Sequence, residues 1–157
     1  MKRPWLLAMG AALAAACSAP QPKPATPWLV AEPPASPGER VVRSARAFLP
    51  EEDGGRATPK DAADFIRRVY AESGHAVPGT LPQLILAGAR VKSAAELRPG
   101  DVVFFCGERL SRIPEHVGLY VKQGVFIHFL RDYGVLLENL SAERYRDRYI
   151  TARRILE

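Results

Sequence analysis

Three side chains in the body of this 157-residue chain could take part in covalent chemistry: the thiol of Cys106 and the imidazoles of His116 and His128. A histidine beside a thiol can take its proton and so make the sulfur a nucleophile. If residues 101–106 and 115–121 pair as antiparallel strands, Cys106 falls almost opposite His116, with Cβ atoms about 4.5–5.5 Å apart. The alternative is that Cys106 is only a small residue at the end of a strand.

The same residue types can bind metal ions, but their spacing in this chain does not support a metal site. The chain has three histidines and two cysteines, and these are widely separated in sequence. Structural zinc sites usually place their ligands in closely spaced pairs. We therefore predict no metal site and no cofactor.

The segments around these residues predict helices first and strands afterwards. Apolar residues recur at helical spacing in residues 40–49, 61–73 and 80–87. Asp61 is a suitable N-cap, Asp64 stands three residues further on, and Gly74 is a natural helix stop. Short β-rich segments between turn residues predict strands at 101–105, 116–121, 125–129, 135–138 and 150–154. This order indicates an α+β domain, with N-terminal helices packed on an antiparallel sheet of about five strands.

Four segments, taken in order, resemble the NlpC/P60 family of papain-like cell-wall cysteine peptidases. They read Asp-Ala-Ala-Asp-Phe-Ile at 61–66, Leu-Arg-Pro-Gly-Asp-Val-Val-Phe-Phe at 97–105, His-Val-Gly-Leu-Tyr at 116–120 and Gly-Val-Phe-Ile-His at 124–128. The resemblance extends over about residues 40–156. It implies the papain-like NlpC/P60 fold and descent from enzymes that cleave peptides of bacterial peptidoglycan, often next to γ-D-glutamyl linkages.

The resemblance assigns roles to individual residues and reveals one departure. The family's nucleophilic cysteine stands in an Asp-Cys-Ser-Gly-Phe motif at the start of the first long helix, and Ala62 occupies its position in this chain. His116 matches the base, and His128 matches the residue that orients the base. Because a methyl group cannot attack a carbonyl, Ala62, His116 and His128 are expected to be relics of a catalytic site.

Asp61 has two candidate roles. It can cap the helix that begins at residue 62, and in the family the matching aspartate is associated with the free amino group of the peptide substrate. We therefore expect Asp61, His116 and His128 to be the residues that bind a ligand.

Two further changes accompany Ala62, because Ala63 replaces the serine of the family motif and Asp64 replaces its glycine. Asp61 and Asp64 flank position 62 within one helical turn, and each carboxylate should raise the pKa of a thiol placed there. We therefore expect Ala62→Cys alone not to restore a reactive nucleophile.

Residues 1–17 are typical of a lipoprotein-type signal peptide. Lys2 and Arg3 form the positive end, an apolar run of 12 residues starts at Trp5, and three alanines precede Cys17. This pattern predicts export, acylation of Cys17 and a membrane anchor.

The residues around Cys17 indicate its destination and leave two alternatives. Ser18, with no aspartate at that position, resembles the pattern that is sorted to the outer membrane of Gram-negative bacteria. The first alternative is ordinary cleavage near Ala16 or Ala19, which would give a soluble secreted protein. The second is a disulfide between Cys17 and Cys106, which the number of cysteines allows.

The segment after the signal has the composition of a tether. Residues 18–38 hold seven of the 14 prolines of the chain, as expected for an extended linker. We therefore divide the chain into a signal peptide at 1–17, a Pro-rich tether at 18–38 and an NlpC/P60-like domain at 39–157.

The charge of the chain is mildly basic. The formal net charge is +5, and removal of Lys2 and Arg3 with a signal peptide would leave 20 basic against 17 acidic residues. The basic residues are interspersed with acidic ones and form no stripe with aromatic residues, so nucleic-acid binding is not predicted.

Together these features predict an exported lipoprotein of the cell envelope, on the outer membrane and facing the periplasm. Its folded domain would be a catalytically inactive member of the NlpC/P60 type that binds a peptidoglycan stem peptide or a cell-wall protein. The alternative is an active peptidoglycan endopeptidase that uses Cys106, or an unrecognised arrangement, as its nucleophile.

Overall fold

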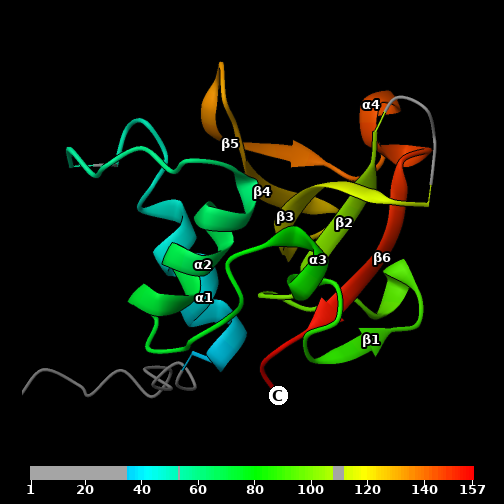
Figure 1. Ribbon diagram of the computed structural model, residues 1–157. Helices are drawn as coiled ribbons and strands as arrows, with labels where there is room; N and C mark the ends of the chain where they lie inside the picture. The colour runs from blue at the N-terminus through cyan, green and yellow to red at the C-terminus, as the bar shows by residue number, and fades with distance from the viewer. Residues whose placement is uncertain (1–34, 53, 108–111) are drawn as a thin grey trace, which may run out of the picture. The chain divides into compact units, whose positions relative to one another are not determined.

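Six antiparallel strands form a single sheet in the computed structural model, which describes residues 35–52, 54–107 and 112–157 (Figure 1). The predicted signal peptide, its Cys17 and nearly all of the predicted tether lie outside the described residues. Pro34–Glu157 form one compact unit. The strand order is β1-β6-β2-β3-β4-β5. The strands are β1 (Ala89–Val91), β2 (Val102–Cys106), β3 (Pro114–Lys122), β4 (Val125–Leu130), β5 (Gly134–Asn139) and β6 (Tyr149–Arg154).

The predicted α+β class is confirmed, and all five predicted strands are present. The sixth strand, β1, was missed because it has only three residues, two of them exposed, and no apolar alternation. It exists because it pairs with β6 at the edge of the sheet, which is a long-range interaction.

The helices are α1 (Pro37–Arg46), α2 (Ala62–Glu72), α3 (Leu81–Leu84) and α4 (Glu143–Arg146), with a 3₁₀ turn η1 (Ala94–Glu96). Helices α1 and α2 pack against each other and against β3, and α4 lies away from them (Figure 1). None of the helices among the described residues is long and apolar enough to cross a membrane.

Helix α1 begins earlier than its apolar spacing predicts. Ser36 accepts a hydrogen bond from the amide of Glu39, and the Glu39 carboxylate accepts one from the amide of Ser36, which forms a complete capping box. Pro37 occupies the first helical position, where its missing N–H costs nothing. The predicted boundary between tether and domain, at 38–39, therefore falls inside the first turn of this helix.

Apolar residues are buried on both faces of the sheet. On β2, Val102 and Phe104 join the cluster beneath α1 and α2, whereas Val103 and Phe105 join a second cluster with Tyr145 of α4. Successive side chains of a strand point to opposite faces, so a strand covered on both faces is apolar throughout. All five residues of β2 are accordingly buried.

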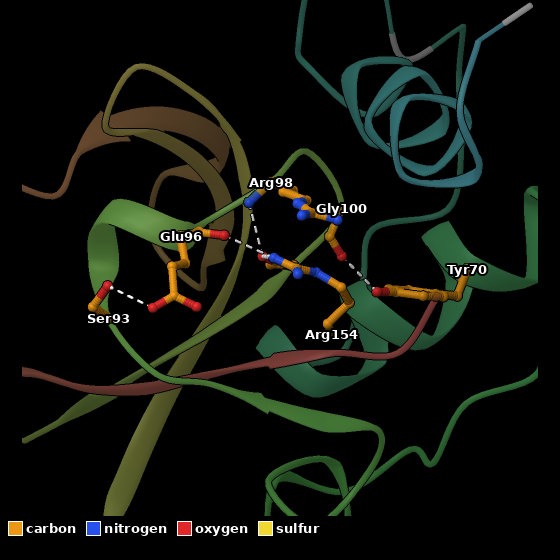
Figure 2. A network of polar contacts seen from close by, with 7 residues as sticks. Tyr70, Ser93, Glu96, Arg98, Gly100 and Arg154 are labelled. Atoms are coloured by element: carbon orange, nitrogen blue, oxygen red, sulfur yellow. Dashed lines mark hydrogen bonds and ion pairs between the residues drawn. The ribbon is translucent and has the colours of Figure 1, made fainter. Parts of the chain in front are cut away.

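A buried polar network holds the start of β2 in place (Figure 2). The carboxylate of Asp101 accepts hydrogen bonds from Nε and Nη2 of Arg154 at 2.9 and 2.7 Å, and from the amide of Arg98 at 2.8 Å. The hydroxyl of Tyr70 on α2 donates to the carbonyl of Gly100 at 2.7 Å. Gly100 has φ +89, and a Cβ at this residue would stand 2.5 Å from Cα of Gly38. The network thereby ties β2 to β6 and to α2.

Candidate functional site

The N-terminus of α2 presents Ala62 as its first helical residue. Asp61 is the N-cap, and its side chain accepts a hydrogen bond from the amide of Asp64 at 2.8 Å. The predicted capping role of Asp61 is therefore confirmed. Its side chain is exposed beside Ala62, so a role in ligand binding stays a prediction.

Asp64 is buried and fully engaged with groups other than position 62. Its carboxylate accepts from the amide of Lys60 at 3.0 Å, and it pairs with Arg67 at 2.6 Å and Arg68 at 2.7 Å. Burial opposes ionisation of Asp64, but the Lys60 amide and the two guanidinium groups outweigh it and lower the pKa of the carboxyl. Two cations thus compensate the negative charge that the sequence places near position 62.

The two predicted site histidines lie side by side on neighbouring strands. His116 of β3 and His128 of β4 meet edge to face, with Nε2 of His116 2.8 Å from Nδ1 of His128. His128 is fully buried, and His116 is half-buried. Gly118 makes room for this pair, because a Cβ there would stand 3.3 Å from Cβ of His128 and 2.7 Å from the ring of Phe126.

A carboxylate behind the histidine pair was not predicted from the sequence. Oε2 of Glu138 on β5 lies 2.9 Å from Nε2 of His128, at contact distance without the alignment of a strong hydrogen bond. Glu138 pairs across the sheet with Phe126. Phe126 is two residues before His128 on β4, so the side chains of Glu138, Phe126 and His128 lie on the same face of the sheet. The only sequence signal for Glu138 is an acidic residue within an otherwise apolar strand pattern.

Burial keeps both imidazoles neutral at pH 7. Burial, followed by electrostatic interactions with His128 and Arg144, lowers the pKa of His116 to about 4, against a smaller opposing effect of Glu138. Burial, followed by Arg144, lowers the pKa of His128 to about 4. A carboxylate accepts hydrogen bonds only, so the nearby Glu138 favours the tautomer of His128 that carries its proton on Nε2. His128 Nδ1 then accepts from Nε2 of His116, which leaves the lone pair of His116 on Nδ1.

Ala62 and His116 line the same cleft, which has a volume of about 180 Å³. Asp61, Glu115 and Leu130 also line it. A second hollow of about 300 Å³ adjoins the cleft through its shared residues, which include Ala62 and Glu115. The structure thus brings together Asp61, Ala62 and His116, with His128 behind the imidazole of His116.

Cys106 does not lie where the sequence predicts. Register shifts between Phe104 and Phe105 on the β6 side, and between Phe105 and Cys106 on the β3 side, move the end of β2 along its partners. His116 pairs with Phe105 in the regular register of the two strands, which would place Cys106 opposite Glu115, and the shift after Phe105 moves Cys106 to Pro114. The thiol is free, buried and at the end of a strand, although Cys106 and His116 line a common cavity. Among the described residues no group of acidic, histidine and cysteine side chains could hold a metal ion.

Comparison with known proteins identifies the fold and the family. The sequence profile of the NlpC/P60 family matches residues 52–154. The chain belongs to the NlpC/P60 family. The predicted resemblance and the predicted fold are therefore confirmed.

Two curated proteins represent the relatives of this NlpC/P60 chain. The gamma-DL-glutamyl hydrolase of Bacillus subtilis is 32% identical over 106 residues, which is 64% of this chain and 25% of that protein. The murein DD-endopeptidase MepS/murein LD-carboxypeptidase of Escherichia coli K12 is 31% identical over 105 residues, which is 65% of this chain and 54% of that protein. The chain thus spans between a quarter and about half of the length of these relatives.

Solved NlpC/P60 structures share the fold at low sequence identity. NlpC1 of Trichomonas vaginalis aligns with a TM-score of 0.66 and 24% identity over 80% of this chain and 46% of that one. The peptidoglycan hydrolase RipB of Mycobacterium tuberculosis aligns with a TM-score of 0.60 and 20% identity over 77% of this chain and 65% of that one.

Proposed function

We propose that this NlpC/P60 domain binds a stem peptide of bacterial peptidoglycan in the cleft at Ala62 and His116 and does not cleave it. The observation that carries the proposal is the methyl group of Ala62 at the first position of α2, in the cleft that His116 lines. A helix N-terminus favours a thiolate, but Ala62 offers no atom that could attack a carbonyl. The named activities of the relatives, on murein and on γ-glutamyl bonds, supply the class of peptide.

The dimensions of the site suit an extended peptide. Three hollows, of about 180, 250 and 300 Å³, share residues with one another, and Glu115 lines all three. Each is large enough for one or two side chains of a ligand. A cell-wall protein that inserts an extended segment is the other occupant that the sequence predicts, and competition with a stem peptide distinguishes the two.

The alternative function is a peptidoglycan endopeptidase with Cys106 as its nucleophile. Cys106 lines a cavity together with His116, which favours the alternative. Against it, Cys106 pairs with Pro114 at a strand end and has no helix N-terminus to stabilise a thiolate.

Calorimetric titration with a synthetic stem peptide, followed by mass spectrometry of the peptide, tests the proposal. We expect saturable binding and recovery of intact peptide. Ala62→Trp, which fills the cleft, should abolish binding. Leu86→Trp, at an exposed position that lines none of the three hollows, should leave it unchanged. Absence of binding by the parent chain would overturn the proposal.

We also propose a location in the cell envelope, with a lipid on Cys17 and the tether of residues 18–38 between membrane and domain. The support is the sequence pattern of residues 1–17 and the murein-directed names of the relatives. Ser18 favours the outer membrane within that location. Mass spectrometry of the mature N-terminus should detect an acylated Cys17, and an N-terminus elsewhere with Cys17 unmodified would refute the anchor.

A further inference from the structure

A cavity of about 250 Å³ adjoins the cleft and shares Glu115 and His116 with it. Arg144 and Arg148, one in α4 and one just after it, also line this cavity. We propose that this cavity is a subsite for a carboxylate group of the bound peptide, which the two arginines recognise. The inference rests on the proposed peptide-binding function and specifies the chemistry of the ligand.

The two arginines are cations without an acidic partner among the described residues. Ion pairs engage other arginines of the unit, such as Arg67, Arg68 and Arg154, but neither Arg144 nor Arg148. A guanidinium group presents a fork of N–H donors that matches a carboxylate in charge and geometry. A cavity that exposes two unpaired guanidinium groups is therefore suited to an anionic ligand group.

A ring contact positions the exposed Arg144 side chain relative to His116. The Arg144 guanidinium lies over the ring of Tyr145, 5.7 Å from its centroid. Tyr145 is buried against the rings of Phe126 and His128, at centroid distances of 4.9 and 5.5 Å. A ligand carboxylate would thus meet donors that are already positioned, which lowers the entropy cost of binding.

The carbonyl oxygen of Arg148 accepts a hydrogen bond from the amide of Cys106 at 2.9 Å, which connects the turn after α4 to the end of β2. This bond fixes the backbone that carries the second guanidinium group.

The electrostatic environment agrees with an anion in this cavity. The positive charge of Arg144 lowers the pKa values of both His116 and His128, after the larger effect of burial. Among the described residues that line the cavity, Glu115 is the single acidic one, against two arginines. The carboxylate of Glu115 lies against Gly107, which also lines the cavity, and it is suited to an N–H group of the peptide.

Three peptides of one sequence test the subsite by calorimetric titration against the full chain. The reference is L-Ala-γ-D-Glu-L-Lys-D-Ala with both carboxylates free, and the other two carry an amide at the C-terminus or at the α-carboxyl of D-Glu. We expect one of the two amides to bind about tenfold more weakly than the reference, as the loss of one charged hydrogen-bonded pair predicts. That peptide identifies the carboxylate that enters the cavity.

Two variants and a matched control connect the effect to the arginines. Arg144→Gln and Arg148→Gln should each lower the affinity for the reference peptide to about that for the weaker-binding amide. Neither change should alter the affinity for that amide. Arg146→Gln is the control, because Arg146 is exposed on the same short helix, pairs with Asp147 and does not line the cavity. Thermal unfolding of each variant checks that the fold is retained.

The outcomes separate this inference from the proposed function. If the parent chain binds all three peptides equally, the carboxylate subsite is refuted and peptide binding stands. The subsite is also refuted if the arginine variants keep the preference for the free carboxylate. If no peptide binds at all, both the subsite and the proposed function are refuted.

Discussion

Nε2 of His116 lies 2.8 Å from Nδ1 of His128, and the carboxylate of Glu138 stands 2.9 Å behind His128. This order of acceptor and donor atoms selects one arrangement of protons, with the lone pair of His116 on Nδ1. A base of a cysteine peptidase needs such a lone pair to take the proton of the thiol. Nδ1 of His116 is thus the nitrogen left to accept a proton, while Ala62 offers a methyl group at the helix N-terminus.

The proton arrangement can be measured by ¹⁵N chemical shifts of the imidazole nitrogens. At pH 7 we expect Nδ1 of His116 to be unprotonated and Nε2 to be protonated. Glu138→Gln should relax this preference, because an amide can donate as well as accept. Glu143→Gln, at an exposed position, is the control. A protonated Nδ1 on His116 in the parent chain would show that Glu138 does not orient the pair.

Stability should fall in mild acid because the histidine pair is buried in its neutral form. The folded-state pKa of each histidine is about 4, below its ordinary value of 6.5, so the unfolded chain binds more protons between these two values. The full contribution is present above pH 6.5 and is lost as the pH falls towards 4. For one such histidine the free energy of unfolding falls by about 3 kcal/mol.

Urea unfolding at a series of pH values measures this loss. His75→Gln, which alters the histidine outside the pair, should keep the dependence between pH 6.5 and 4. Asp64 contributes little in this window, because its stabilisation is lost only as the pH falls through and below its ordinary pKa of 3.8. A free energy of unfolding that is constant from pH 7 to 4.5 would contradict neutral burial of the pair.

The Asp101–Arg154 pair should be important for stability. Asp101 is 1% exposed and receives two hydrogen bonds from Arg154, so Asp101→Asn leaves a partly buried cation without its charge partner. We expect a loss of about 3 kcal/mol in the free energy of unfolding, measured in urea. Asp147→Asn breaks the exposed pair with Arg146 and should cost less than about 0.5 kcal/mol. Equal effects of the two changes would be inconsistent with the network.

A thiol at position 62 should be more acidic than the sequence predicts. The sequence expectation rests on the negative charges of Asp61 and Asp64, but Arg67 and Arg68 compensate the charge of Asp64 in the structure. The helix N-terminus then dominates the electrostatics at position 62. It stabilises a negative charge by about 0.3–1 kcal/mol at exposed sites and by up to ~2 kcal/mol at partly buried ones. We therefore expect Ala62→Cys to lower the thiol pKa by about one unit from 8.5.

The rate of alkylation against pH measures that pKa, in chains that also carry Cys17→Ala and Cys106→Ala. Ala71→Cys is the matched control, because Ala71 is exposed in the last turn of the same helix, where the dipole has the opposite sign. If the thiols of the two variants have the same pKa, the N-terminus of α2 does not activate position 62.

Local signals in the sequence predict those parts of the fold that local interactions determine. Asp61 and Gly74 delimit α2 as expected, because capping depends on residues within one turn of each end. Gln123 and Gly124 join β3 to β4 with positive φ angles of 52 and 79, which the type of Gly124 favours and that of Gln123 does not.

Features that depend on pairing between distant strands could not be predicted. Glu138 meets His128 only because of the register between β4 and β5, and no local pattern reveals that register. The expected opposition of Cys106 and His116 is wrong because the register between β2 and β3 pairs His116 with Phe105, and an irregularity after Phe105 moves Cys106 further, to Pro114. The four-residue helix α4, which carries Arg144, is likewise too short for a periodic pattern to indicate it.

Digestion of purified peptidoglycan tests most directly whether this domain binds without catalysis. The full chain and its Cys106→Ala variant are incubated with peptidoglycan, and released muropeptides are quantified by liquid chromatography and mass spectrometry. We expect the chain to sediment with the polymer and neither form to release muropeptides above the level of buffer. Release of muropeptides by the parent chain that disappears in Cys106→Ala would contradict a binding role and establish Cys106 as the nucleophile.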